Sequence, residues 1–118
     1  MGGFEIDGIK LISIERERQI DIEGHTSTFD DGYANNELSM AAACYATPVQ
    51  LYRLGVHGRG YHFIDPWPWR SEILGSSGEI IENYAWDKRI KHDYKRRLVI
   101  AGALIAAELD RIQRAEKT

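Results

Sequence analysis

The segment from Asp93 onward, DYKRRLVIAGALIAAELDRIQRAEKT, constrains the fold more than any other part of the chain. Large apolar residues recur there at helical spacing and form one stripe: Leu98, Ile105, Leu109 and Ile112, with Val99 and Leu104 beside it. This periodicity predicts a long amphipathic helix. A second surface of the same helix consists of small residues: Ala101, Gly102, Ala103, Ala106 and Ala107. Small side chains let two helix axes approach closely, so we expect tight packing against another helix.

The stretch ELSMAAACYA, which begins at Glu37, supplies a matching alanine-rich helix. One face of it carries Leu38, Ala41, Ala42 and Tyr45. Asn35 or Asn36 is a suitable N-cap, and Pro48 stops the helix. Cys44, the single cysteine, lies within the apolar run and is expected to pack as a small hydrophobic residue without a disulfide.

The N-terminal part predicts a further helix. Asp7 can cap a helix that starts near Gly8, and the pattern favours helix over residues 13–23, with an end at Gly24. The competing interpretation is a strand through IKLISI, where Ile and Leu alternate with Lys and Ser.

Residues 47–92 lose the helical periodicity and are rich in glycine, aromatic residues and turn signals. The stretches QLYRLGV and GYHFI can form a short β-hairpin around HGRG. The chain therefore predicts a mainly α fold: a single domain over residues 1–118, with three helices and a long aromatic, partly irregular segment between the second and third. A length of 118 residues is ordinary for one domain.

The composition excludes several classes of protein. Apolar residues make up 43% and charged residues 28%, which is typical of a globular chain rather than a disordered one. No apolar stretch approaches the ~20 residues that span a bilayer, and the first residues lack a basic region followed by an apolar one. The net charge of −3 makes nucleic acid an unfavoured partner. We expect a cytoplasmic protein that does not bind membranes.

Four stretches together resemble a family of small, mostly uncharacterised proteins of bacteriophages and prophages. They are ERERQIDIEG, DDGYANNELSMAAACYA, WPW and RRLVIAGALIAAELDRI, in this order and at fitting separations, and they cover about half of the chain. The family is known mainly as accessory genes, so the resemblance implies host takeover or anti-defence, in the cytoplasm of the host cell. Relatives commonly look like Gly-Trp at positions 24 and 25, where this chain has Gly24-His25. They look like His-Asp-Asp where it has Phe29-Asp30-Asp31.

Aromatic residues are concentrated between residues 52 and 86, and Pro66 and Pro68 rigidify Trp67 and Trp69. Aromatic faces and arginine planes stack on nucleotide bases, and a glycine-rich turn such as GVHGRG, which contains Arg59, can hold phosphate. The structural alternative is that the two tryptophans cover one end of the helix bundle.

The run KRIKHDYKRR carries six cations within ten residues: Lys88, Arg89, Lys91, Lys95, Arg96 and Arg97. They can neutralise phosphate groups. Their position at the start of the last helix is unfavourable, because the N-terminal end of a helix dipole is positive, and an anionic ligand would relieve that repulsion. The alternative is a solvated helix start.

Asp30, Asp31 and Glu37 lie in a polar loop and its following helix, and carboxylates of this kind can hold Mg²⁺. All-α nucleotide pyrophosphohydrolases use paired carboxylates spaced Glu-x-x-Glu and Glu-x-x-Asp, and Arg18 and Arg111 replace the second member here. The favoured alternative is structural: Asp30 or Asp31 binds backbone N–H groups and pairs with Arg16 or Arg18. His25 is a turn residue or a ligand contact.

The leading hypothesis is a non-enzymatic phage accessory protein that sequesters a phosphorylated, nucleotide-derived small molecule, with no cofactor and no catalytic residue. The candidate ligand contacts are His25, Arg59, Trp67, Trp69, Lys95, Arg96 and Arg97. One alternative is a protein that binds and inhibits a host defence enzyme. The other is a Mg²⁺-dependent nucleotide pyrophosphohydrolase that uses Asp30, Asp31 and Glu37. The small-residue helices also favour a homo-oligomer.

Overall fold

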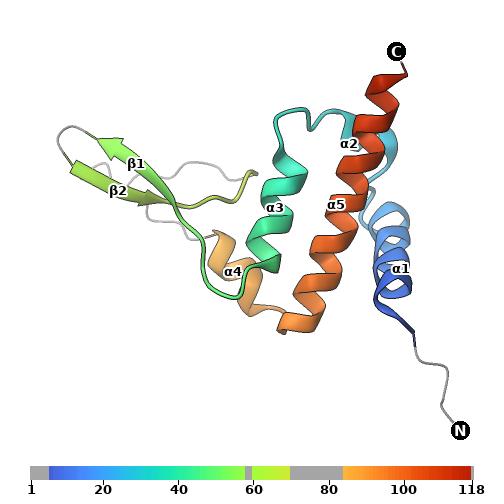
Figure 1. The fold of residues 1–118 in the computed structure, drawn as a ribbon, viewed down its shortest axis with the longest axis horizontal. Helices are drawn as coiled ribbons and strands as arrows, with labels where there is room; N and C mark the ends of the chain where they lie inside the picture. The colour runs from blue at the N-terminus through green and yellow to red at the C-terminus, as the bar shows by residue number, and fades with distance from the viewer. Residues whose placement is uncertain (1–5, 58–59, 70–83, 118) are drawn as a thin grey trace, which may run out of the picture.

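The computed structural model describes residues 6–57, 60–69 and 84–117 (Figure 1). Its elements are α1 (Gly8–Asp21), α2 (Ser27–Asp31), α3 (Glu37–Ala46), β1 (Arg53–His57), β2 (Gly60–Ile64), α4 (Tyr84–Ile90) and α5 (Tyr94–Glu116). The described part is mainly helical with one two-stranded antiparallel sheet, which confirms the predicted fold class. The three predicted helices correspond to α1, α3 and α5, whereas α2 and α4 are short helices that the sequence pattern did not indicate.

Helix α5 lies at the centre of the helical part, with α3 on one side and α1 on the other (Figure 1). The Asp93 side chain begins the helix by accepting a hydrogen bond from the Arg96 backbone N–H at 2.8 Å. The core lies between α5 and α3. It contains Ala101, Leu104 and Ala107 from α5 and Leu38, Ala41, Ala42 and Cys44 from α3. The predicted close packing of two small-residue helix faces is therefore confirmed.

The stripe of large apolar residues on α5 does not face this core. Leu98, Ile105, Leu109 and Ile112 are each 38% to 55% exposed, whereas Ala101 and Ala107 beside them are almost fully buried. The buried face of the helix is thus the small-residue face. The sequence predicted the packing of the small-residue face but did not show that the large apolar stripe would stay exposed.

Helix α1 begins where the sequence predicts, because the Asp7 side chain accepts a hydrogen bond from the Lys10 backbone N–H at 2.8 Å. The alternative strand through IKLISI is wrong, since those residues are helical. The helix ends at Asp21 rather than at Gly24, and Gly24 adopts a positive φ of 76° in the turn that follows. This left-handed conformation reverses the chain toward α2 at a position that favours glycine.

Helix α1 packs on α5 at Gly102. A Cβ atom at position 102 would lie 2.7 Å from Cγ1 of Ile12 and would also overlap its Cδ1. We expect Gly102→Val to lower the free energy of unfolding by about 1–3 kcal/mol, because the added methyl groups overfill this contact. Urea unfolding followed by tryptophan fluorescence measures the change. Adding Ile12→Ala should recover part of the loss, and an unchanged urea midpoint for Gly102→Val would contradict the packing.

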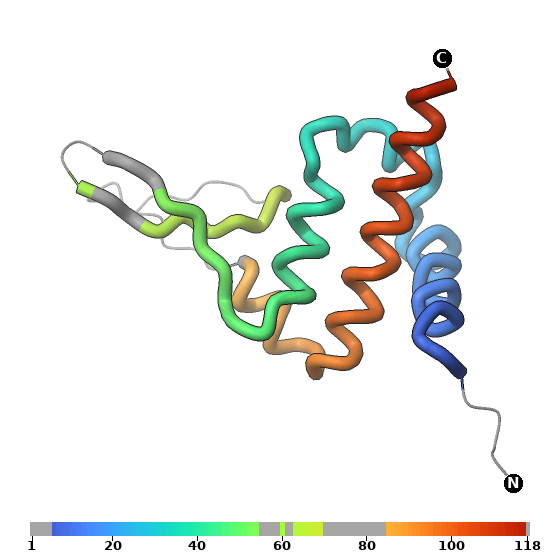
Figure 2. Tube along the Cα trace, in the orientation of Figure 1, coloured from blue at the N-terminus to red at the C-terminus, as the bar shows by residue number. Residues whose placement is uncertain are grey.

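The predicted hairpin is confirmed, with β1 and β2 pairing from Arg53 opposite Ile64 to His57 opposite Gly60. It extends away from the helices (Figure 2). The chain then returns through residues 65–69 to the core, where Trp67 packs. The expected hydrophobic role of Cys44 is also confirmed: it is 1% exposed, and burial raises the pKa of its thiol to about 11. None of the helices in the described ranges is long and apolar enough to cross a membrane.

Candidate ligand-binding site

A cavity of about 340 Å³ opens where the aromatic segment, the turn after α1, and helices α3, α4 and α5 meet. Its lining residues are Glu23, His25, Tyr45, Trp67, Trp69, Lys88, Ile100 and Leu104. The volume lies within the ~300–1,000 Å³ that sites for small molecules occupy. Three of the predicted ligand contacts, His25, Trp67 and Trp69, therefore share one cavity although more than 40 residues separate His25 from Trp69.

Aromatic rings form the wall of this cavity. The Trp67 and Trp69 rings are perpendicular, with centroids 5.5 Å apart, and Tyr45 meets Trp67 edge-on at 5.7 Å. The Tyr33 ring also packs against Trp69, with centroids 5.0 Å apart. Such edge-to-face pairs fix each ring against its neighbour. Trp67 is also part of the core. It therefore has a structural role as well as a place in the cavity wall.

Asp65 holds the aromatic segment in place. Its carboxylate is 4% exposed and accepts hydrogen bonds from the Trp67 backbone N–H at 2.8 Å and from the Ala85 backbone N–H at 3.0 Å. One buried side chain thus ties the cavity wall to the start of α4. A carboxylate suits this position because it accepts several N–H groups at once.

The polar groups of the cavity carry both signs of charge. The Lys88 ammonium lies 5.3 Å from the centroid of the Trp67 ring, in cation–π contact. Arg18 holds the Glu23 carboxylate at 2.6 Å, and the His25 imidazole lies 3.9 Å from the other Glu23 oxygen. The Trp69 indole nitrogen is buried and has no hydrogen-bond acceptor among the residues that the structure describes. The cavity therefore offers a cation and an acceptor beside flat apolar faces.

Tyr45, which lines the cavity, carries a hydroxyl group that can donate a hydrogen bond. Burial raises the pKa of Tyr45 to about 12, and the negative charges of Glu23 and Glu15 contribute to the rise. The hydroxyl consequently stays protonated at neutral pH. A planar ligand with hydrogen-bonding edges and a negatively charged group matches this combination of side chains.

His25, in the turn after α1, contacts Phe29 of α2. Their rings stack, with centroids 5.4 Å apart and planes 12° from parallel, and Phe29 also meets Tyr33 edge-on.

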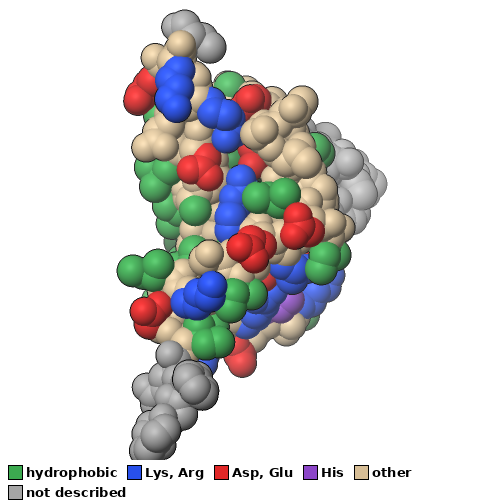
Figure 3. Space-filling view, turned by 90° about the vertical axis from the view of Figure 1, so that its right-hand side faces the viewer, with side chains coloured by type: hydrophobic (Ala, Val, Ile, Leu, Met, Phe, Trp, Pro, Cys, Tyr) green, Lys and Arg blue, Asp and Glu red, His purple; other side chains and the backbone are tan. Residues whose placement is uncertain are grey.

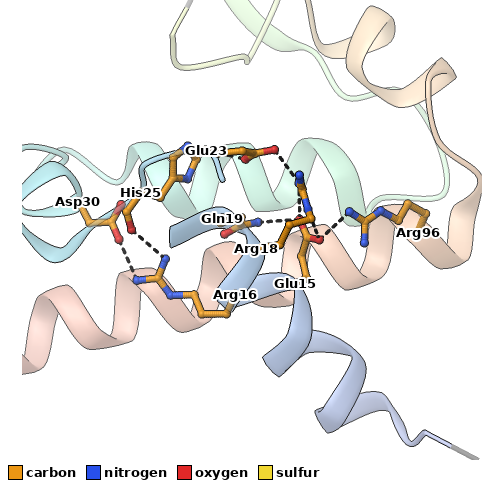
Figure 4. Close-up of polar contacts among 8 residues, drawn as sticks. All are labelled: Glu15, Arg16, Arg18, Gln19, Glu23, His25, Asp30 and Arg96. Atoms are coloured by element: carbon orange, nitrogen blue, oxygen red, sulfur yellow. Dashed lines mark hydrogen bonds and ion pairs between the residues drawn. The ribbon is translucent and has the colours of Figure 1, made fainter. Parts of the chain in front are cut away.

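Helix α1 carries a buried ionic network centred on Glu15, which is 1% exposed (Figure 4). Arg18 binds both Glu15 oxygens at 2.9 Å, Arg96 from α5 binds one at 2.6 Å, and Gln19 donates to the other at 3.3 Å. Burial alone would raise the pKa of Glu15, but the hydrogen bonds and charges of Arg18 and Arg96 outweigh it, so the pKa is lowered. The network joins α1 to α5.

The carboxylates of the metal-dependent alternative are engaged separately. Asp30 is fully buried and pairs with Arg16 at 2.9 Å, as the structural alternative expected, while Asp31 pairs with Arg114 at 2.7 Å. The Glu37 carboxylate accepts a hydrogen bond from the Asn35 backbone N–H. Over residues 6–57, 60–69 and 84–117, no group of three or more histidine, cysteine or carboxylate side chains is placed to hold a metal ion.

The cations of the basic run contact several different partners. Arg89 and Arg97 donate to carbonyl oxygens at the end of α3, and both reach Thr47 O, at 2.5 Å and 3.1 Å. These carbonyls are the negative end of the α3 dipole, which offsets the repulsion expected at the start of α5. Burial and the neighbouring charge of Arg97 lower the pKa of Arg89.

Lys95, Arg96 and Arg97 do not line the aromatic cavity. Lys95 and Arg96 line a separate hollow of about 260 Å³ between α1 and α5. Arg97 lies against the end of α3, and Arg59 is outside the described residues. A ligand role for these four residues stays a prediction.

Sequence reasoning missed Tyr45, Lys88 and Glu23 as members of one site. Tyr45 was placed only on a helix face, and Lys88 only in a charge run. Their common cavity depends on contacts between distant segments, which no local pattern encodes. Comparisons of the chain with models of protein families, with curated proteins and with solved structures gave no match.

Proposed function

We propose that this protein binds a phosphorylated, nucleotide-derived small molecule in the aromatic cavity and sequesters it without turnover. The observation that carries the proposal is the cavity itself, where two perpendicular indole rings and Tyr45 lie beside the Lys88 ammonium and the Glu23 carboxylate. The resemblance to phage and prophage accessory proteins supplies the setting: a small molecule made by a host defence system is a ligand whose removal benefits a phage.

Each part of such a ligand has a complementary group. A nucleobase stacks on an indole or phenol face, which contributes about 1–3 kcal/mol per base. Its N–H groups donate to Glu23, and one of its acceptors meets the protonated Tyr45 hydroxyl. Lys88, already positioned over Trp67, lies where it can pair with a phosphate oxygen.

The first experiment exposes the purified protein to a mixture of nucleotides, cyclic dinucleotides and ADP-ribose derivatives with Mg²⁺, removes the protein by filtration, and chromatographs the filtrate. Depletion of one compound supports binding, and its intact return after heating supports sequestration. A compound that returns altered would instead support the hydrolase alternative. A mixture left unchanged overturns the proposal.

Lys88→Ala should weaken the affinity for the depleted compound by about 10- to 100-fold, because a charge-assisted hydrogen bond contributes roughly 1.5–3 kcal/mol. Titration calorimetry measures the change. Lys91→Ala is the matched control, since Lys91 is an exposed lysine three residues further on that does not line the cavity. Equal affinity in the wild type and Lys88→Ala would exclude Lys88 as a contact.

The second candidate function is binding to a host protein. Apolar side chains exposed on the surface favour it, among them Trp86 at 47% and Phe63 at 72%. Aromatic residues of this kind commonly anchor protein interfaces. This function predicts a stoichiometric complex with one host enzyme and no effect of nucleotides on the protein.

A further inference from the structure

The exposed stripe of α5 is a continuous apolar surface on the longest helix. It runs from Tyr94 through Leu98, Ile105 and Leu109 to Ile112, with each side chain 38% to 55% exposed. In the view that looks onto α1, apolar side chains gather along one edge of the molecule (Figure 3). The stripe lies between the face of α5 that packs on α3 and the position, Gly102, that packs on α1. Neither neighbouring helix covers it.

The spacing of the stripe is that of a helix that pairs with another helix. Leu98, Ile105, Leu109 and Ile112 follow one another at intervals of seven, four and three residues. This repeat averages 3.5 residues, which keeps one seam facing a partner helix along its whole length. A helix that packs only against its own core does not require large apolar residues at this spacing on its exposed side.

The seam also complements itself when two copies run antiparallel. Leu98 and Ile112 each lie seven residues from Ile105, so an axis through Ile105 places Leu98 of one copy opposite Ile112 of the other. The same axis places Ile105 of one copy opposite Ile105 of the other. Large residues thus face large ones at the axis and at both ends of the seam.

The charges at the two ends of α5 also favour the antiparallel arrangement. The exposed Lys95 lies at the start of α5 and the exposed Glu116 at its end, both beside the stripe. An antiparallel pair brings Lys95 of each copy near Glu116 of the other. A parallel pair would instead place like charges together at each end.

We propose that a second copy of this chain covers the stripe, so that two α5 helices pack antiparallel about a two-fold axis at Ile105. The interface is isologous, as in most homodimers. It uses the large apolar stripe rather than the small-residue face that the sequence suggested for oligomers, because α3 already occupies that face. The aromatic cavity lies outside this interface in both copies: of its lining residues, Ile100 and Leu104 come from the buried side of α5.

Sedimentation velocity over a range of concentrations tests the dimer. The wild type should sediment as a dimer at the highest concentrations and dissociate on dilution, since a single helix face makes an interface at the small end of the usual range. Ile105→Glu should sediment as a monomer throughout, because two carboxylates would meet at the axis. Ile9→Glu is the matched control: Ile9 is 82% exposed, lies on α1 outside the seam, and should leave the dimer unchanged.

A charge exchange tests the orientation. Lys95→Glu alone should weaken the dimer, and Lys95→Glu combined with Glu116→Lys should restore it, which only the antiparallel arrangement explains. Circular dichroism verifies that each variant is folded. A wild type that stays monomeric at every concentration, or a folded Ile105→Glu that still dimerises, would overturn the proposal. Failure of the charge exchange to restore the dimer would overturn the antiparallel register.

Discussion

Replacing Glu15 with glutamine is expected to lower the free energy of unfolding by about 2–3 kcal/mol. The substitution removes the only carboxylate that joins Arg18 and Arg96 in the described network and leaves their charges without a shared partner. Breaking a fully buried pair usually costs about 3–5 kcal/mol. The value is smaller here because Arg18 and Arg96 are 35% and 38% exposed and can turn toward water. Urea unfolding at neutral pH, followed by tryptophan fluorescence, measures the loss.

Glu17→Gln is the control for this substitution, because Glu17 lies on the same helix with an exposed side chain. It should change the free energy of unfolding by less than about 0.5 kcal/mol. If the two variants unfold at the same urea concentration, the network does not stabilise the fold.

The same substitution should alter the pH dependence of stability. The pKa of Glu15 is lowered in the folded state, so its stabilisation is present above the ordinary pKa of about 4.3 and is lost as the pH falls through the lowered value. The wild type should therefore lose stability more steeply than Glu15→Gln as the pH falls below about 4.

Asp65→Ala is expected to lower the free energy of unfolding by about 2–4 kcal/mol and to remove ligand binding. The substitution leaves the buried Trp67 and Ala85 backbone N–H groups without their acceptor, and each such loss costs roughly 1–3 kcal/mol. Because the aromatic segment and α4 both depend on Asp65, the positions of Trp67 and Lys88 in the cavity should shift together. Urea unfolding and titration with the depleted compound measure the two effects.

Two further variants separate the role of Asp65 from a general effect of removing a carboxylate. Asp65→Asn keeps one carbonyl oxygen and should lie between the wild type and Asp65→Ala in stability. Asp87→Ala removes an exposed carboxylate from α4 and should leave both stability and binding unchanged. Wild-type stability in Asp65→Ala would show that the segment is held by its rings alone.

Helices and strands whose ends are set by residues close in the sequence were predictable. Asp7 was identified as a helix cap because a capping side chain lies within three residues of the N–H group it binds. The last helix was placed from about Asp93 by its apolar periodicity. The limits of α3 and the hairpin followed from turn residues in the same way. Helices α2 and α4 were missed because five and seven residues are too few for a helical period to be recognised.

The site was only partly predictable, since its geometry depends on contacts between distant segments. Trp67 and Trp69 were identified because aromatic residues are concentrated in their segment. Their meeting with His25 in one cavity depends on how α1 and α3 each pack on α5. Arg96 and Arg97 looked like free cations in the sequence. Their partners, Glu15 and the carbonyls at the end of α3, are 81 and about 50 residues away, beyond what charge patterning can link.

The C-terminal end of α3 is hydrogen-bonded by arginines that lie much later in the sequence and are therefore synthesised later. Arg89 and Arg97 donate to the carbonyls of Cys44, Tyr45 and Thr47, which a helix more often satisfies with residues of its own C-cap. A nascent chain that stops before Arg89 therefore contains α3 with an incomplete terminus. Helices α3 and α5 should accordingly become stable together, late in synthesis, so that the fold is completed from its C-terminal half rather than assembled in chain order.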